Sequence, residues 1–214
     1  MGASQSKMSG TTDKEAAVLT GQGIDNTYVK AEGREVIYLA GGCFWGMEKL
    51  AQALPGVTNA VSGYANGTSD STPSYELVCR GGTGYKETVR VVYDPAVITL
   101  PQILQAYFLV IDPTVSNRQG NDAGAQYQTG VYYNDAATQE MVERIVATEM
   151  KKYDAFFVEH EPLVNFYDAE DYHQDYLEKN PNGYCHIPAH EIDEVAALIT
   201  AEEGYEKPTQ EQLK

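Results

Sequence analysis

The sequence predicts an α+β domain with a ferredoxin-like plait, the split βαβ fold, in which helices cover one side of an antiparallel or mixed sheet. The first observation is the order β-α-β-β-α-β, which the apolar patterns follow between residues 35 and 133. The second is a hydrophobic content of 43% over 214 residues, which is enough for one domain with a sizeable core. Around this plait we expect long loops and a coiled C-terminal tail.

Each element of the plait has its own local signal. The run EVIYLA predicts the first strand, and the helix that follows ends at Pro55-Gly56. The alternating ETVRVVYD is typical of a half-buried strand, and Pro101 suits the first turn of the next helix. The full prediction is strands over 35–40, 57–65, 87–94 and 129–134, helices over 43–54, 100–110 and 135–153, a helical turn at SYELVC, and an edge strand over 162–166.

Composition divides the chain into three parts. Residues 1–33 are rich in Gly, Ser, Thr and charge without an apolar period, which predicts a flexible arm. Residues 34–192 are predicted to form the domain. Residues 193–214 are predicted to be an acidic tail, and the end of that tail resembles a linker to a further domain.

The charge balance excludes some partners. Thirty-one acidic against fifteen basic residues give a net charge of −16, which repels nucleic acid and anionic lipid. No stretch approaches the roughly 20 apolar residues that a membrane span needs. The first residues lack the apolar core of a secretory signal, although MGASQS fits the short pattern for myristoylation at Gly2. We therefore expect a cytoplasmic protein that binds neither nucleic acid nor membrane.

The stretch AGGCFWG places a cysteine between two glycines and the only tryptophan of the chain. The three cysteines are widely spaced and odd in number, so they do not indicate a disulfide scaffold. Cys43 follows a strand and begins a helix, where unpaired backbone N–H groups lower the pKa of a thiol. This pattern fits a nucleophilic thiolate and, equally, a buried corner between a strand and a helix.

Two other kinds of site fit parts of the sequence. A cysteine hydrolase would use Cys43 with His173 or His160 as its base, but the flanking pattern CGSCW of papain-like proteases is missing. A metal-binding module would use Cys185, His186 and His190 of "CHIPAH" together with another cysteine. Pro188 interrupts the helix that would place the two histidines on one face.

Several longer motifs resemble the A-type peptide methionine sulfoxide reductase family from residue 35 to about residue 190. They are GCFWG, SGYANG, PSYELVC, TGYKETVRVVYDP, RQGNDAGAQYQ and DYHQDYLEKNPNGYC. The resemblance implies thiol-dependent reduction of the S-epimer of methionine S-oxide, free or in proteins. It places the nucleophile at Cys43, which becomes a sulfenic acid, and the general acid at Glu87, which burial would keep protonated.

The same resemblance implies roles for further residues. The hydroxyls of Tyr75 and Tyr127 would bond the sulfoxide oxygen, and Asp122 would belong to the pocket. Phe44 and Trp45 would hold the S-methyl group of the substrate. Cys185, in a turn-rich segment, would form a disulfide with Cys43.

The resemblance also implies the reductant. Because no cysteine follows Cys185, thioredoxin would reduce the Cys43–Cys185 disulfide directly, dithiothreitol would serve in the test tube, and no cofactor or metal would be needed. Cys79 is expected to be an inert structural thiol. We expect a monomer, or one half of a longer protein that fuses an A-type and a B-type reductase.

Overall fold

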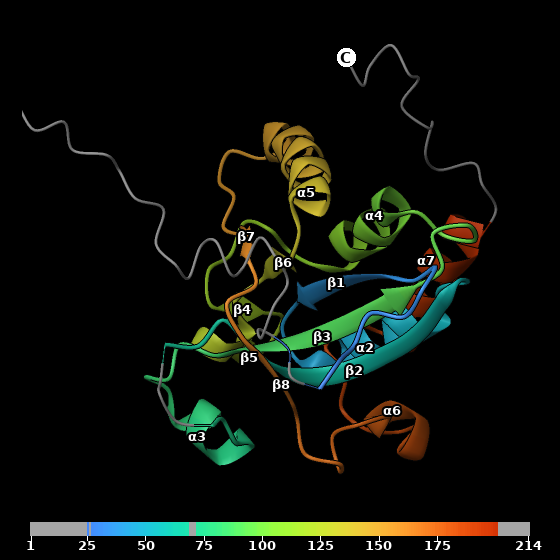
Figure 1. The fold of residues 1–214 in the computed structure, drawn as a ribbon. Coiled ribbons are helices and arrows are strands. Elements are labelled where there is room, and N and C mark those ends of the chain that lie inside the picture. Colours follow the sequence, from blue (N-terminus) through green and yellow to red (C-terminus); the bar gives the residue numbers. More distant parts are fainter. Residues whose placement is uncertain (1–24, 26, 69–71, 201–214) are drawn as a thin grey trace, which may run out of the picture.

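The computed structural model describes residues 25, 27–68 and 72–200. Its main feature is a six-stranded sheet with the order β7-β6-β1-β3-β2-β8, drawn in the centre of Figure 1. The sheet consists of β1 (Glu35–Ala40), β2 (Val57–Ala65), β3 (Lys86–Tyr93), β6 (Gly130–Tyr133), β7 (Glu159–Pro162) and β8 (Phe166–Asp168). A separate two-stranded ladder pairs β4 (Arg118–Gln119) with β5 (Asp122–Ala123).

The middle of the sheet has the predicted plait. β1 pairs antiparallel with β3 on one side and with β6 on the other, and β2 pairs antiparallel with β3. The two added edge strands differ, because β7 runs parallel to β6 and β8 runs antiparallel to β2. The predicted fold class, a mixed sheet with helices on one side, is therefore confirmed.

Side-chain caps mark the starts of two of the main helices. Thr99 forms a capping box with Gln102 at the start of α4, and the Asp135 side chain accepts a hydrogen bond from the Thr138 N–H at the start of α5. The helices are α2 (Phe44–Ala53), α3 (Tyr75–Arg80), α4 (Leu100–Val110), α5 (Ala136–Glu149), α6 (Tyr176–Lys179) and α7 (Ala189–Thr200), with 3-10 turns η1 (Ala125–Tyr127) and η2 (Met150–Lys152). No helix in the described part of the chain is long and apolar enough to cross a membrane.

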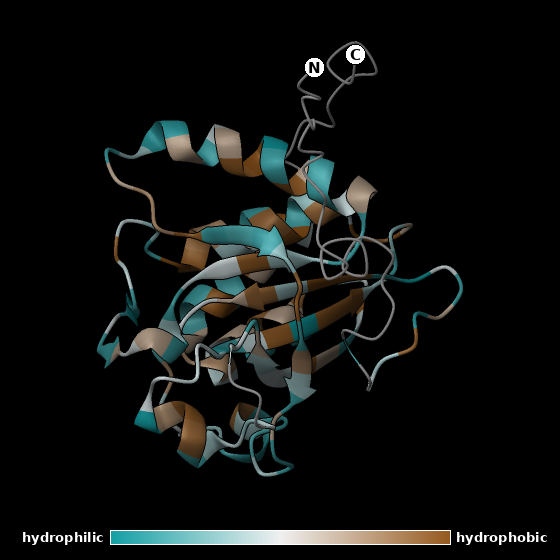
Figure 2. Ribbon diagram, turned by 60° about the vertical axis from the view of Figure 1, so that its left-hand side comes forward, coloured by the Kyte–Doolittle hydropathy of each residue, from teal (hydrophilic) through white to brown (hydrophobic). Residues whose placement is uncertain are grey.

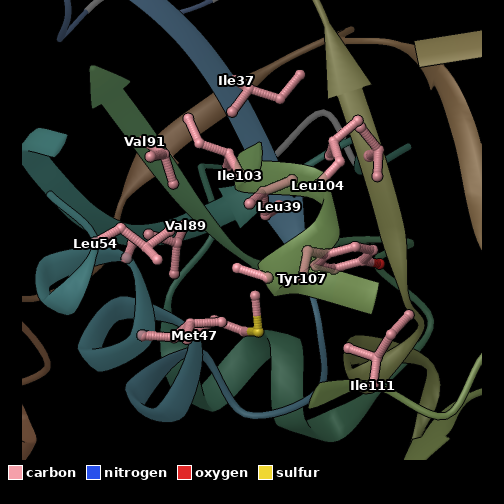
Figure 3. Close-up of a cluster of buried hydrophobic side chains, with 14 of the residues drawn as sticks. Ile37, Leu39, Met47, Leu54, Val89, Val91, Ile103, Leu104, Tyr107 and Ile111 are labelled. Carbon is pink, nitrogen blue, oxygen red and sulfur yellow. The ribbon is translucent and has the colours of Figure 1, made fainter. Parts of the chain in front are cut away.

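The two faces of the sheet bury different residues because neighbouring side chains of a strand point to opposite faces. Ile37, Leu39, Val89 and Val91 point to the face that the helices cover and pack there against Met47 and residues of α4, as Figure 3 shows. A smaller cluster on the other face includes their sequence neighbours and residues of other strands. It consists of Val36, Tyr38, Ala40, Ala65, Val92, Tyr132, Leu163 and Phe166. Figure 2 shows that hydrophobic and hydrophilic segments alternate along the helices, as expected for helices that bury one face against the sheet.

The structure corrects the prediction at two places. The edge strand expected over residues 162–166 is wrong, because β7 ends at Pro162, β8 begins at Phe166, and buried Leu163 lies between them on the helix-free face. The tail expected after residue 192 is helical as far as Thr200. Its spaced apolar residues Ile192, Val195 and Ile199 are buried in the main core.

The described end of the predicted arm contacts the sheet. Asp25 forms an isolated bridge with Phe166, and its carboxylate pairs with Arg90. The myristoylation pattern and the rest of residues 1–24 lie outside the described residues, as does the possible linker after residue 200.

Candidate active site

Cys43 lies at the turn between β1 and α2. Gly42 has a φ of +86°, a left-handed conformation that favours glycine, and Cys43 is the N-cap residue of α2. The cysteine is 6% exposed and belongs to the edge of the main core. The sequence therefore delivers the thiol to a helix N-terminus, as the two glycines predict.

The ionisation of Cys43 differs from the expectation. Burial raises the pKa of the Cys43 thiol far above its ordinary value, and negative charge on Glu87 acts in the same direction. A hydrogen bond from the Trp45 backbone N–H lowers this pKa, but burial has the larger effect. The expected thiolate is thus wrong for this state, in which Cys43 carries its proton.

Glu87 provides a second proton beside Cys43. It lies at the start of β3, 2% exposed, and its Oε2 accepts a hydrogen bond from the Phe44 N–H at 3.1 Å. Burial raises the pKa of Glu87 to about 8, more than the hydrogen bond lowers it. The carboxyl group is therefore mostly protonated at neutral pH and can donate a proton.

Three other predicted residues face the same space. Tyr75 begins α3, Tyr127 ends η1, and Asp122 begins β5. Burial raises the pKa of both tyrosines, Cys79 is the next cause for Tyr75, and electrostatic interaction with Glu87 and Cys43 raises the pKa of each further. Both phenols therefore lie near Glu87 and Cys43. Asp122 also acts on the pKa of these two groups, so α3, η1 and β5 bring the three residues to one site.

Phe44 and Trp45 have different surroundings. Phe44 is 1% exposed and packs against the rings of Tyr64 and His173. Trp45 is half-buried, stacks on Tyr176 with 3.7 Å between ring centroids, and donates its indole N–H to His173 Nδ1 at 3.1 Å. The indole is therefore fixed on two sides and offers a rigid apolar wall.

Cys185 reaches the first turn of α2. A Cβ atom built on Gly46 would lie 3.0 Å from Cys185 Sγ, so a larger residue at this position would push the thiol away by a few tenths of an ångström. The thiol is half-buried, and burial raises its pKa. All three cysteines are free in this structure, and Cys79 is exposed on α3, with its thiol hydrogen-bonded to Tyr75.

Comparisons with known proteins identify the family. Residues 35–203 match the family model described as peptide methionine sulfoxide reductase. The chain belongs to this family. Reduced Mxr1 from Saccharomyces cerevisiae is 38% identical with a TM-score of 0.70, over 76% of this chain and 94% of the yeast chain. Methionine sulfoxide reductase A of Corynebacterium diphtheriae is 37% identical with a TM-score of 0.68, over 75% and 80% of the two chains.

A third similar structure contains a partner. It is Mxr1 in complex with Trx2, 26% identical with a TM-score of 0.51, over 72% of this chain and 92% of the yeast chain. Together these relatives make the chain an A-type methionine sulfoxide reductase that depends on thiols.

The structure supports neither the cysteine hydrolase nor the metal-binding module that the sequence left open. His160 lies on β7 with Nδ1 at 3.2 Å from the Val158 carbonyl, and His173 uses Nδ1 to accept the Trp45 indole proton. Neither histidine shows a contact with Cys43. Among residues 25, 27–68 and 72–200, no group of three or more His, Cys, Asp or Glu side chains is placed to hold a metal ion.

Sequence reasoning missed three residues of the reductase site. Glu170 accepts hydrogen bonds from the Tyr75 N–H and the Tyr64 hydroxyl, both at 2.8 Å. Tyr176 stacks on Trp45, and the Tyr184 hydroxyl donates to Asp122 at 3.1 Å. Tyr176 and Tyr184 lie within the motif DYHQDYLEKNPNGYC, which could have indicated them, and Glu170 directly precedes it.

Proposed function

We propose that this reductase acts on the S-epimer of methionine S-oxide, free or in proteins, with Cys43 as nucleophile and Glu87 as general acid. The observation that carries this assignment is the pair of protonated groups at the start of α2. The Glu87 carboxyl accepts the Phe44 N–H at 3.1 Å and has a pKa raised to about 8 by burial. It can therefore donate a proton next to Cys43 near neutral pH.

The chemistry transfers one oxygen atom. Cys43 Sγ attacks the sulfoxide sulfur while Glu87 protonates the oxygen, which Tyr75 and Tyr127 bond as its charge grows. The Cys43 thiol proton passes to the Glu87 carboxylate and restores this acid, the oxygen passes to Cys43 Sγ, and methionine is released as Cys43 becomes a sulfenic acid. Asp122 completes the polar side of the pocket, and Phe44 and Trp45 form the apolar side for the methyl group, which contributes only about 1–3 kcal/mol of discrimination.

Cys185 then closes a disulfide with Cys43, and thioredoxin reduces it. Exposure supports attack at Cys185, because this thiol is half-buried whereas Cys43 is buried. A cavity of about 480 Å³ lies beside Cys185 and is lined also by Leu177, Pro181 and Ile192. Such a hollow gives an incoming thiolate access to the Cys185 sulfur.

A single-turnover experiment without reductant tests the residue roles. With the separated S-epimer, we expect the wild-type protein to form about one methionine per chain and to lose two of its three free thiols. Cys185→Ser should still form one methionine but keep a sulfenic acid, and Cys43→Ser should form none. Methionine formed by Cys43→Ser, or equal turnover of the R-epimer, would contradict the proposal.

We further propose that the reductase works in the cytoplasm as a monomer, supported by its acidic composition and thiol chemistry. Size-exclusion chromatography with light scattering on the purified chain checks the monomer. The mass of the native gene product checks whether a B-type domain follows.

A further inference from the structure

His186 follows Cys185 directly, and its position is not explained by the roles above. Its side chain is 4% exposed, yet neither ring nitrogen makes a well-formed hydrogen bond among the described residues. A buried polar group without a partner is costly and needs an explanation. The metal module that this histidine suggested is not formed, since no metal-binding cluster is present in the described part of the chain.

The imidazole ring lies over the turn that presents Cys43. A Cβ atom built on Gly42 would lie 3.1 Å from His186 Nε2, and one built on Gly46 would lie 3.4 Å from His186 Cε1. The same point above Gly46 is 3.0 Å from Cys185 Sγ. Gly42 precedes Cys43 and Gly46 lies on the first turn of α2. Because neither has a side chain, the Cys185 thiol and the His186 ring can pack close to this turn.

Asp122 lies on the other side of the ring. Its Oδ1 accepts the Tyr184 hydroxyl, while its Oδ2 has no partner and lies 4.0 Å from His186 Nδ1. A carboxylate beside one ring nitrogen favours the tautomer that leaves the other nitrogen free to accept a proton. It also stabilises the imidazolium that forms after the proton is accepted.

We propose that His186 is the proton acceptor for the resolving step, in which Cys185 attacks the sulfenic acid of Cys43. This step rests on the proposed function. The Cys185 S–H proton passes to His186, the S–S bond forms, and the S–O bond of Cys43 breaks. Glu87 protonates the departing hydroxide to give water, and His186 returns its proton to solvent, from which Glu87 is reprotonated. The sulfenic acid is the oxidant, so no other reactant is needed.

The electrostatics of the resting site fit this order of events. Burial lowers the pKa of His186 more than Asp122 and the Gly41 backbone raise it, so the ring is neutral at pH 7 and can take up a proton. Burial raises the pKa of Cys185, so its thiol needs a base to ionise. Asp122 is the titratable side chain that acts on the His186 pKa, and Cys43, Glu87, Tyr184 and Cys185 each interact electrostatically with Asp122.

The test measures two rates in one turnover without reductant, methionine formation and loss of free thiols. In the wild-type protein we expect the two to coincide. In His186→Asn, methionine should form at the wild-type rate while disulfide formation lags, with its own rate constant lowered by about 10²- to 10⁴-fold at pH 7. That lag should shrink as pH rises, because hydroxide then replaces the missing base. His190→Gln is the matched control, since His190 is exposed at the start of α7.

The outcomes separate the possible roles. Coincident rates in His186→Asn would overturn the proposal, and so would an equal loss in both rates, which indicates a structural role. A pH-independent lag would also contradict it. Where His186→Asn fails to fold, His186→Gln is measured with the same two readouts. If the wild-type protein itself forms no methionine, the proposed function fails instead.

Discussion

β3 carries two buried charged residues on opposite faces of the sheet, and the molecule treats them differently. Glu87, on the helix face, has a backbone N–H as its hydrogen-bond partner, and its pKa is raised to about 8. Arg90, three residues later on the other face, lies 2.8 Å from Asp25 Oδ2 and 3.0 Å from Asp168 Oδ1. The carboxylate of Asp25 is 6% exposed, so it is as deeply buried as the site.

The difference shows how one strand separates chemistry from structure. A buried carboxyl group without a cation keeps its proton and can act as an acid. A buried carboxylate with an arginine stays charged and ties the chain segment that carries it to the sheet. Alternation along β3 directs Glu87 to the site and Arg90 away from it.

The largest effect is expected on the rate of methionine formation when Glu87, the buried carboxyl group without a cation, is replaced. Glu87→Gln keeps the shape and a hydrogen-bond donor but removes the acidic proton, so we expect the rate of methionine formation to fall by about 10²- to 10⁴-fold. Single-turnover kinetics with the S-epimer measure this rate. The gap between wild type and variant should narrow above pH 8, because the wild-type protein then loses its acid. A gap that stays constant from pH 6 to 10 would argue against Glu87 as the acid.

Glu87→Gln also tests the comparison through the pH dependence of the free energy of unfolding. Because the pKa of Glu87 is higher in the folded state than in the unfolded state, the folded state binds more protons between these two values. The free energy of unfolding should therefore fall as pH rises toward about 8. Glu87→Gln removes this contribution, which urea unfolding at pH 5 and pH 8 would detect as a flatter profile. A wild-type profile that rises over this range would contradict the assignment.

The next largest effect is expected on the free energy of unfolding when the buried ion pair between Arg90 and Asp25 is broken. Arg90→Met leaves the buried Asp25 carboxylate without its cation, so we expect a loss of about 3–5 kcal/mol in the free energy of unfolding. Methionine formation per folded molecule should not change, because Arg90 lies on the face away from Cys43. Urea unfolding and active-site titration measure the two quantities. The double variant Arg90→Met with Asp25→Leu should recover most of the loss, since the buried carboxylate is then absent and the Asp168 carboxylate, 39% exposed, is solvated.

The plait could be predicted because its signals are local. Strand alternation, the Pro55-Gly56 stop and the helix over residues 100–110 depend on neighbours in sequence, and all three agree with the structure. The end of the chain could not be predicted so well. The apolar residues Ile192, Val195 and Ile199 of α7 have helical spacing, but acidic residues between them favoured a tail, and the burial of these residues against α2 and α4 is a tertiary effect.

The site divides in the same way. The position of Cys43 at a helix N-terminus follows from Gly41-Gly42, but its ionisation does not, because burial and Glu87 are contributed by distant parts of the chain. The contacts of Tyr176 with Trp45 and of His186 with Gly42 and Gly46 join residues that are far apart in sequence. No periodic pattern encodes such pairs, so a single sequence cannot predict them.

The smallest effect is expected at a third buried carboxyl group, Glu48 on α2, which combines features of the other two. Like Glu87, it has no ion-pair partner among the described residues, and burial raises its pKa to about 7. Like Asp25, it stabilises the fold, because it accepts hydrogen bonds from the Ser62 N–H at 3.3 Å and the Asp175 N–H at 2.9 Å. In Glu48→Ala the Ser62 N–H keeps Gln174 Oε1 at 3.0 Å, so only the Asp175 N–H loses its acceptor. We therefore expect a loss of about 1 kcal/mol in the free energy of unfolding.

The loss in Glu48→Ala should be greater at pH 5 than at pH 8. Between these values the wild-type protein loses the favourable protonation of Glu48, whereas the variant has no such group to lose. Urea unfolding at both pH values measures the difference, with Glu140→Ala on the exposed side of α5 as the matched control. An equal loss at both pH values would mean that Glu48 acts through packing alone. A greater loss at pH 8 would mean that the ionised form of Glu48 is the stabilised one, because only a charged form with a favourable partner gains stability on ionisation.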